Sequence, residues 1–219
     1  MNNKPIFKIS EVKIKKEDRA GFRKEQEAEL ENSIPAEEGT LLLASGHEDA
    51  EGEDNYIVEL YRNPKAYEIH SMANYFDHYD KTISNMATSK KVYDLNGEWI
   101  TTKPKEALDA YADKFVIRVV KVEIADGKHD EFAATVKKEM RCAIAQEPGV
   151  EILMAGSNKE NENEWLFFEV YANDEAYDKH VKSKWFVDYI KGSEDIVKDK
   201  QIHELTRDVM AVQGPIVMD

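Results

Sequence analysis

The sequence predicts an α+β fold in which one chain carries two copies of a β-α-β-β-α-β module. Two observations predict it. The sequence aligns with itself at an offset of 110 residues, so that residues 7–96 match residues 117–206 without a gap, and 20 of the 90 pairs are identical. Unrelated sequences should agree at roughly 5–7% of positions, given ordinary residue usage. Both copies also show the same order of strand-like and helix-like patterns, so the chain is an internal duplication.

The first half of each copy is predicted as a strand followed by a helix. Residues 6–14 and 115–124 are rich in β-branched residues and partly alternate between apolar and polar, as a half-buried strand does. The next stretch has apolar residues at helical spacing on a strongly charged background. Gly39 and Gly149 are expected to end these helices. The apolar residues are Phe22, Leu30 and Ile34 in one copy and Phe132, Val136, Met140 and Ile144 in the other.

The second half of each copy is predicted as two strands, a helix and a further strand. A polar, acidic loop joins the two strands and is typical of an exposed hairpin connection. Asn63 and Asn173 occupy N-cap positions, because a short polar side chain there bonds the free N–H groups of the first helical turn. The helix that follows is expected to run, with a possible break, to about residues 85 and 195. The strands are expected at 41–46, 56–61 and 90–96 and at 151–156, 165–171 and 200–206.

This element order is that of the ferredoxin-like fold. An antiparallel sheet with helices on one face leaves its other face uncovered, so each copy needs a second sheet to pack against. Tandem fusion supplies that sheet within one chain. We therefore expect one module at residues 1–98, a second at residues 115–219, and a linker at residues 99–114 that contains Pro104 and a short helix-like stretch.

Charge and cysteine content limit the partners and the compartment. The 219 residues include 30 basic and 44 acidic side chains, a net charge of −14, which disfavours nucleic acid and anionic membranes as partners. Cys142 is the single cysteine, so an intrachain disulfide is impossible and a reducing compartment is expected. The N-terminal stretch lacks the apolar run of a signal sequence, and no run approaches the ~20 apolar residues that span a bilayer. These features predict a cytoplasmic protein.

A motif with the pattern E-x-Y-x(4)-A-Y-x(2)-H-x(5)-F occurs at residues 59–76 and again at residues 169–186. It resembles the antibiotic biosynthesis monooxygenase family of dimeric α/β barrels, and the resemblance covers both repeats. Most members are homodimers of single modules. The resemblance implies two modules packed sheet to sheet as an intramolecular version of that dimer, with one pocket per repeat between sheet and helices. A homodimer of the tandem chain is a further possibility.

The same resemblance implies a function. The family includes cofactor-free oxygenases of anthrones and quinols, haem-degrading proteins and members with no established reaction. We therefore expect a cofactor-independent monooxygenase that acts on a quinol-like or anthrone-like aromatic small molecule. The chain has no Cys/His zinc spacing and no Gly-rich phosphate loop, so neither a metal nor a cofactor is expected.

His70 and His180, which match each other in the repeat, are the candidate catalytic residues. Cofactor-free oxygenation needs a base that removes a proton from the substrate, and a His with a pKa near neutrality suits that step. The alternative is that each His only locks its helix to the sheet. The candidate substrate-binding residues are Tyr61, Tyr171, Glu59, Glu169, Phe76 and Phe186, for which a packing or hydrogen-bonding role is the alternative.

Haem-degrading members differ from this chain at the positions that matter. They have a Trp where this chain has His70 and His180, and the iron-ligating His where it has Asp80 and Ile190. Ile190 cannot ligate iron and Asp80 is a poor haem ligand, so haem degradation is disfavoured. A haem-binding relative with altered ligation stays an alternative, as does a non-catalytic module that binds an aromatic ligand or serves in stress.

The two pockets are not expected to be equivalent, because several matched positions carry different residues. At most one pocket is predicted to be active. His47, His129 and His203 match no histidine in the other copy and are expected to be surface or incidental residues. The differing pairs are Ser10 and Val120, Asp80 and Ile190, and Met72 and Lys182.

Overall fold

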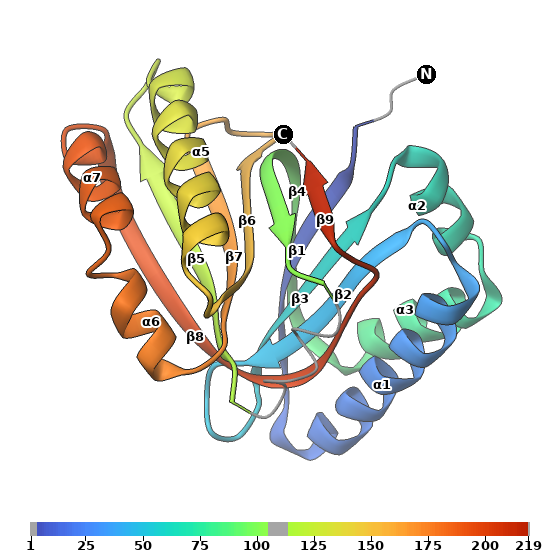
Figure 1. The fold of residues 1–219 in the computed structure, drawn as a ribbon. Coiled ribbons are helices and arrows are strands. Elements are labelled where there is room, and N and C mark those ends of the chain that lie inside the picture. Colours follow the sequence, from blue (N-terminus) through green and yellow to red (C-terminus); the bar gives the residue numbers. More distant parts are fainter. Residues whose placement is uncertain (1–3, 105–113, 219) are drawn as a thin grey trace. The chain divides into compact units, whose positions relative to one another are not determined.

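A computed structural model describes residues 4–104 and 114–218, which form two compact units (Figure 1). Among the described residues, unit 1 comprises 4–95 and Leu205–Gln213, and unit 2 comprises 96–104, 114–204 and 214–218. The helix-like stretch expected after Pro104 lies outside the described residues. No helix within the described ranges is long and apolar enough to cross a membrane.

Unit 1 has the element order that the sequence predicts, apart from an added 3-10 helix, and its second helix is in two pieces. Its elements are β1 (Ile6–Ile14), the 3-10 helix η1 (Lys16–Asp18), α1 (Arg19–Ala36), β2 (Thr40–His47), β3 (Asp54–Tyr61), α2 (Pro64–Ser71), α3 (Asn74–Met86) and β4 (Ala87–Thr102). The sheet is antiparallel, with β3 between β1 and β2. The first part of β4 pairs with β1, and the end of β8 pairs with β2.

Unit 2 repeats this order. Its elements are β5 (Val116–Ile124), α5 (His129–Gln146), β6 (Val150–Asn158), β7 (Glu164–Tyr171), α6 (Asp174–His180), α7 (Lys184–Ser193), β8 (Val197–Val212) and β9 (Ile216–Met218). Strand β7 lies between β5 and β6 in an antiparallel sheet. Glu169 of β7 is opposite Arg118 of β5, as Glu59 of β3 is opposite Lys8 of β1.

The predicted caps and the predicted break in the second helix are confirmed. The side chains of Asn63 and Asn173 accept hydrogen bonds from the N–H groups of Ala66 and Ala176, at 3.0 and 2.9 Å. Each helix is interrupted after about two turns, which separates α2 from α3 and α6 from α7. In unit 2 the second piece has a cap of its own, because Ser183 Oγ accepts from a backbone N–H of its first turn.

Gly39 and Gly149 are needed for close packing, and the expectation that they end the helices is corrected. Helices α1 and α5 end three residues earlier, and neither glycine is among the residues with positive φ. A Cβ at Gly39 would lie 2.4 Å from Cβ of Ala66, and one at Gly149 would lie 2.3 Å from Cβ of Ala176. The missing side chains therefore let each turn lie directly against the helix that carries the histidine.

Strands β4 and β8 are longer than predicted, and the end of each belongs to the other unit. In unit 2, Glu98 on β4 accepts a hydrogen bond from Ser157 Oγ at 2.9 Å and lies 3.1 Å from His129 Nε2. In unit 1, Asp208 on β8 is bound by Arg19 and lies 3.2 Å from His47 Nδ1. All three positions match at the 110-residue offset, so the two strand ends are held by equivalent acid contacts.

The expectation that His47 and His129 are surface or incidental residues was therefore wrong. Their side chains are only 14% and 24% exposed, because each contacts the acid at a strand end. The strand-end acids lie just beyond the range in which the two copies align, so no pattern within the copies connects them with these histidines.

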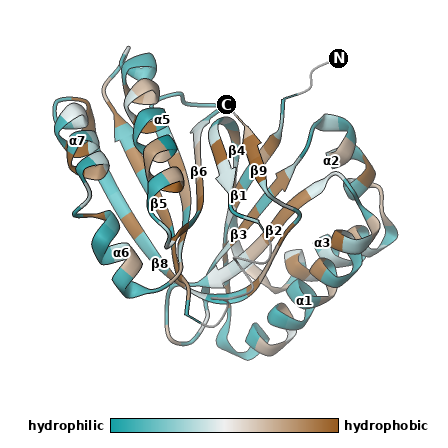
Figure 2. Ribbon diagram, viewed as in Figure 1, coloured by the Kyte–Doolittle hydropathy of each residue, from teal (hydrophilic) through white to brown (hydrophobic). Residues whose placement is uncertain are grey.

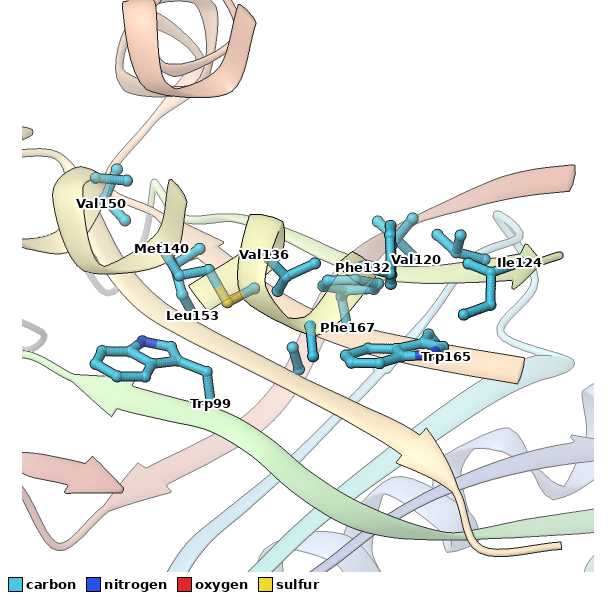
Figure 3. Packing of buried hydrophobic residues seen from close by; sticks show 14 of the residues in the cluster. Trp99, Val120, Ile124, Phe132, Val136, Met140, Val150, Leu153, Trp165 and Phe167 are labelled. Atoms are coloured by element: carbon cyan, nitrogen blue, oxygen red, sulfur yellow. The ribbon is translucent and has the colours of Figure 1, made fainter. Parts of the chain in front are cut away.

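Each helix of the first pair buries its apolar side against its sheet. In Figure 2, α1 and α5 carry apolar residues on part of their surface and hydrophilic residues on the rest. Figure 3 shows Phe132, Val136 and Met140 of α5 directed toward Trp165 and Phe167 of β7. Phe132 is fully buried and contacts Trp165 edge-on, with ring centroids 4.9 Å apart. This packing fixes α5 on the sheet. It therefore also fixes the polar residues of α5 that lie next to the apolar ones.

Candidate functional site

His180 of unit 2 is held between two carboxylates. It is the last residue of α6 and is 2% exposed. Its Nδ1 lies 3.1 Å from Glu147 Oε2, and its Nε2 lies 3.7 Å from Glu139 Oε1. The imidazole also packs between Tyr171 and Phe186, with centroid distances of 5.1 and 5.0 Å. The ring is thus fixed in orientation, with one nitrogen toward each acid.

His70 of unit 1 has the same surroundings. Its Nδ1 lies 3.0 Å from Glu37 Oε2 and its Nε2 lies 3.5 Å from Glu29 Oε1. Tyr61 and Phe76 pack on the ring, with centroids 5.0 and 4.5 Å away. Both copies of the module therefore build one buried arrangement of a histidine and two glutamates.

Local structure explains how these groups meet. Glu139 is seven residues after Phe132, which is two helical turns, so it extends from the side of α5 that faces the sheet. Glu147 follows the end of α5, in the turn that Gly149 packs against Ala176 of α6. Since His180 is one turn further along α6, this close approach brings the Glu147 carboxylate to the imidazole.

In unit 1 the two acids are well supplied with hydrogen-bond donors. Besides His70, Glu37 accepts from the hydroxyl groups of Tyr75 and Thr40. Glu29 accepts from Ser33 Oγ at 2.6 Å, although its Oε2 has no hydrogen-bond partner in the described part of the chain. A buried carboxylate bonded in this way is stabilised in place.

In unit 2 the matched positions lack those donors. Trp185, Val150 and Ala143 stand where unit 1 has the tyrosine, the threonine and the serine. Consequently Glu139 Oε1 and Glu147 Oε1 are buried without a hydrogen-bond partner among the described residues. Such groups are rare in folded proteins and are costly to maintain, so each requires a reason.

Burial and charge shift the pKa values of the unit 2 pair. Burial raises the pKa of Glu139 from 4.5 to about 7, although the nearby His180 opposes the shift. Burial also disfavours the charged form of His180, but its hydrogen bond to Glu147 and the charges of Glu139 and Glu169 outweigh that effect and raise its pKa. Glu139 is therefore a carboxyl group that can exchange a proton near neutral pH.

A cavity of about 30 Å³ opens beside this pair in unit 2. It has room for about two water molecules. Cationic, acidic and aromatic side chains come together along it. Its lining comprises Arg118, Val120, Val136, Glu139, Met140, Phe167, Glu169, Tyr177, His180, Phe186, Tyr189, Lys200 and Ile202.

Three of the residues predicted for a site in unit 2 line this cavity: His180, Glu169 and Phe186. Tyr171 instead lies behind Glu169, to which it donates a hydrogen bond of 2.9 Å, and packs on His180. In unit 1, Tyr61 likewise donates to Glu59 at 2.7 Å. The predicted tyrosine and glutamate therefore meet within each unit.

The sequence reasoning missed both acids that contact each histidine. The signal was present, since Glu29 matches Glu139 and Glu37 matches Glu147 as identical pairs in the repeat. Glu29 and Glu139 also fall on the apolar side of a predicted helix, where an acid needs a partner. Among residues 4–104 and 114–218, no group of three or more His, Cys, Asp or Glu side chains could hold a metal ion.

Comparison with known proteins places the chain in a family. A family profile described as antibiotic biosynthesis monooxygenase matches residues 115–192. The crystal structure of a proposed monooxygenase from Lactobacillus acidophilus NCFM is 47% identical in sequence and has a TM-score of 0.92, covering 99% of this chain and 100% of that one. The chain belongs to the antibiotic biosynthesis monooxygenase family. No curated protein matches the sequence.

Two further solved structures share the fold over nearly the whole length of this chain. A proposed monooxygenase from Fusobacterium nucleatum is 21% identical, with a TM-score of 0.89 over 100% of this chain and 99% of that one. An anthrone oxidase-like protein is 9% identical, with a TM-score of 0.65 over 98% and 96% of the two chains. These likenesses confirm the predicted fold class, two ferredoxin-like modules in one chain of the dimeric α/β-barrel type.

Proposed function

We propose that this family member is a cofactor-independent monooxygenase that acts on an electron-rich aromatic small molecule of the quinol or anthrone type, and that unit 2 carries the reaction. One observation supports this most strongly. The cavity of unit 2 reaches a buried His180–Glu139 pair whose acid has an unpartnered oxygen and a pKa of about 7. The anthrone oxidase-like protein with the same fold supports the substrate class.

The reaction needs a base and dioxygen. For an anthrone-type methylene, the base removes one proton, and the resulting carbanion gives electrons to O₂ and forms a C–O bond. The peroxide then loses water and leaves a carbonyl group, so that R₂CH₂ and O₂ become R₂C=O and H₂O. The substrate supplies all the electrons, so the balance requires no other reductant.

The lining of the cavity suits these steps. Reduction of O₂ creates negative charge, which Arg118 and Lys200 on the same cavity would stabilise. A cavity of about 30 Å³ admits O₂ or the reacting edge of the substrate, but not a ring system. The apolar part of the lining, including Phe167 and Phe186, keeps the anion away from bulk water.

Glu139 and His180 have different roles in this proposal. Glu139 accepts the substrate proton, because this residue lines the cavity and its Oε1 has no hydrogen-bond partner among the described residues. His180 is held at Nδ1 by Glu147, and its Nε2 positions the Glu139 carboxylate. Since Glu139 must be ionised to act, the rate should rise as the pH increases through about 7.

Oxygen consumption tests the proposal. Purified, metal-free protein is incubated with a panel of anthrones and hydroquinones, and ¹⁸O₂ is used to follow the oxygen atoms. We expect protein-dependent uptake, one labelled oxygen in the product, and a rate reduced at least tenfold in His180→Gln. Uptake no faster than in buffer across the panel would contradict the proposal and favour a non-catalytic aromatic-binding module. A Soret band on titration with haem would instead support the haem-binding alternative.

A further inference from the structure

A second and larger cavity lies between α5 and α7 of unit 2. It measures about 280 Å³, against about 30 Å³ for the cavity beside His180. Both helices are amphipathic and pack together in the unit (Figure 1). We call this cavity the α5–α7 groove. Its lining comprises Ala134, Thr135, Lys138, Glu139, Trp185, Asp188, Tyr189 and Gly192.

Ala134 and Gly192 contribute little or no side chain to the groove. The helices approach closely at Gly192, where a Cβ would lie 3.3 Å from Thr135 Cγ2. In unit 1 the position matching Thr135 is Glu25, which forms an ion pair with His78 of α3 at 3.4 Å. That pair joins α1 and α3 of unit 1 at the positions that match two lining residues of the groove, Thr135 and Asp188.

Glu139 lines both cavities of unit 2. It is 8% exposed, and its Oε1 has no partner in the described structure. A buried carboxyl group in the wall of an open groove can accept a hydrogen bond from a ligand that lies there.

The charges around the groove favour a neutral ligand. Lys138 and Asp188 line it with opposite charges, and Asp188 is also bound by Lys184. Trp185 and Tyr189 offer aromatic surface on the α7 side. A ligand that fits has a flat apolar ring system and a single hydrogen-bond donor directed at Glu139.

We infer that the α5–α7 groove binds the ring system of a neutral phenolic aromatic, whose hydroxyl group donates a hydrogen bond to Glu139. The small cavity on the other side of Glu139 then receives O₂. Only the link to oxygenation rests on the proposed function, because binding in the groove does not require a reaction.

Binding of 2-naphthol under anaerobic conditions tests the inference. Affinity is measured by titration calorimetry for the wild type and for Gly192→Leu, which fills the groove. The control is Thr82→Leu at the matched position of unit 1. We expect at least tenfold weaker binding in Gly192→Leu and an unchanged affinity in the control. Ala134→Lys/Thr135→Glu, which introduces the residues of unit 1, should weaken binding in the same way and serves if Gly192→Leu does not fold.

The hydrogen bond to Glu139 is tested separately. Glu139→Leu should weaken 2-naphthol binding several-fold while leaving 2-methoxynaphthalene, which has no donor, unaffected. The inference is overturned by a wild type that does not bind 2-naphthol, or by folded groove-filling variants that bind it as tightly as the wild type.

The two proposals can fail separately. Groove-dependent binding without oxygen uptake would contradict the proposed function alone. Oxygen uptake with an unchanged KM in Gly192→Leu would contradict the groove alone.

Discussion

Units 1 and 2 build the same buried histidine and surround it differently. In unit 1, the acid beside His70 Nδ1 also accepts hydrogen bonds from Tyr75 and Thr40. In unit 2, the acid beside His180 has lost both donors, and a cavity opens beside the imidazole. A hydrogen bond to a charged group is worth about 1.5–3 kcal/mol. Unit 2 lacks that stabilisation at Glu147, as is typical of a functional site, whereas in unit 1 it is Glu29 Oε2 that has no partner among the described residues.

The difference also shows how a duplicated chain can separate stability from function. One copy retains the interactions that hold its helices on its sheet. The other copy has a buried carboxylate with a pKa of about 7, small residues between two helices, and aromatic side chains around the opening. That at most one pocket is active stays a prediction, and unit 2 is the copy that we propose as active.

The largest expected effect on stability concerns the strand ends that each unit receives. Asp208, with a side chain 1% exposed, is paired with Arg19, whereas Glu98 contacts His129 and Ser157 and is 15% exposed. Asp208→Asn should lower the free energy of unfolding by about 3 kcal/mol, because it leaves a mostly buried arginine without its carboxylate partner. Glu98→Gln should cost about 1 kcal/mol. Chemical denaturation of the two variants measures the difference, and equal losses would contradict the assignment.

The free energy of unfolding should depend on pH through Glu139. Because its folded-state pKa is raised to about 7, its contribution is full below the ordinary value of 4.5 and is lost as the pH rises through about 7. The raised pKa of His180 acts in the same direction, since its contribution is full below 6.5 and lost above its folded-state value. The shift of Glu139 corresponds to a loss on the order of 3 kcal/mol at most.

Glu139→Gln removes that titration and keeps the shape of the side chain. We therefore expect the fall in stability between pH 5 and pH 8 to be smaller in this variant than in the wild type. Denaturant titrations at a series of pH values measure it. A fall as steep in Glu139→Gln as in the wild type would show that another group is responsible.

A smaller effect comes from exchanging one hydrogen bond between the units. Val150→Thr places a hydroxyl group beside Glu147, and Thr40→Val removes the corresponding group from Glu37. We expect a gain of about 1 kcal/mol from the first change and a loss of about 1–3 kcal/mol from the second. Thermal melting of both variants tests the opposite signs. Losses of similar size in both would mean that the Glu147 carboxylate of unit 2 is not stabilised by an added hydrogen-bond donor.

The sequence was sufficient for the order of elements, since two aligned copies constrain one another. The caps at Asn63 and Asn173 and the position of the histidines also followed from local patterns. The strand ends did not, because residues 97–102 and 207–212 lie beyond the range in which the copies align. Their partners are far away in the sequence, and a local pattern cannot show which sheet edge a strand will join.

Only part of the site could be predicted, because some of its residues are far apart in the sequence. The motif on β7 and α6 identified His180, Glu169 and Phe186, which are close together along the chain. Glu139 and Glu147 come from α5 and the turn after it, and only the packing of Gly149 against Ala176 brings them to the imidazole. The α5–α7 groove depends on which residues are small, which the shared motif does not record.

Oxygen uptake by two matched variants tests whether unit 2 is the active copy. Glu139→Gln and Glu29→Gln make the same change at matched positions of the two units. With an anthrone substrate at pH 8, we predict a rate at least 100-fold lower in Glu139→Gln, as expected for the loss of a general base, and within twofold of the wild type in Glu29→Gln. Equal losses in the two variants, or a larger loss in Glu29→Gln, would contradict the claim.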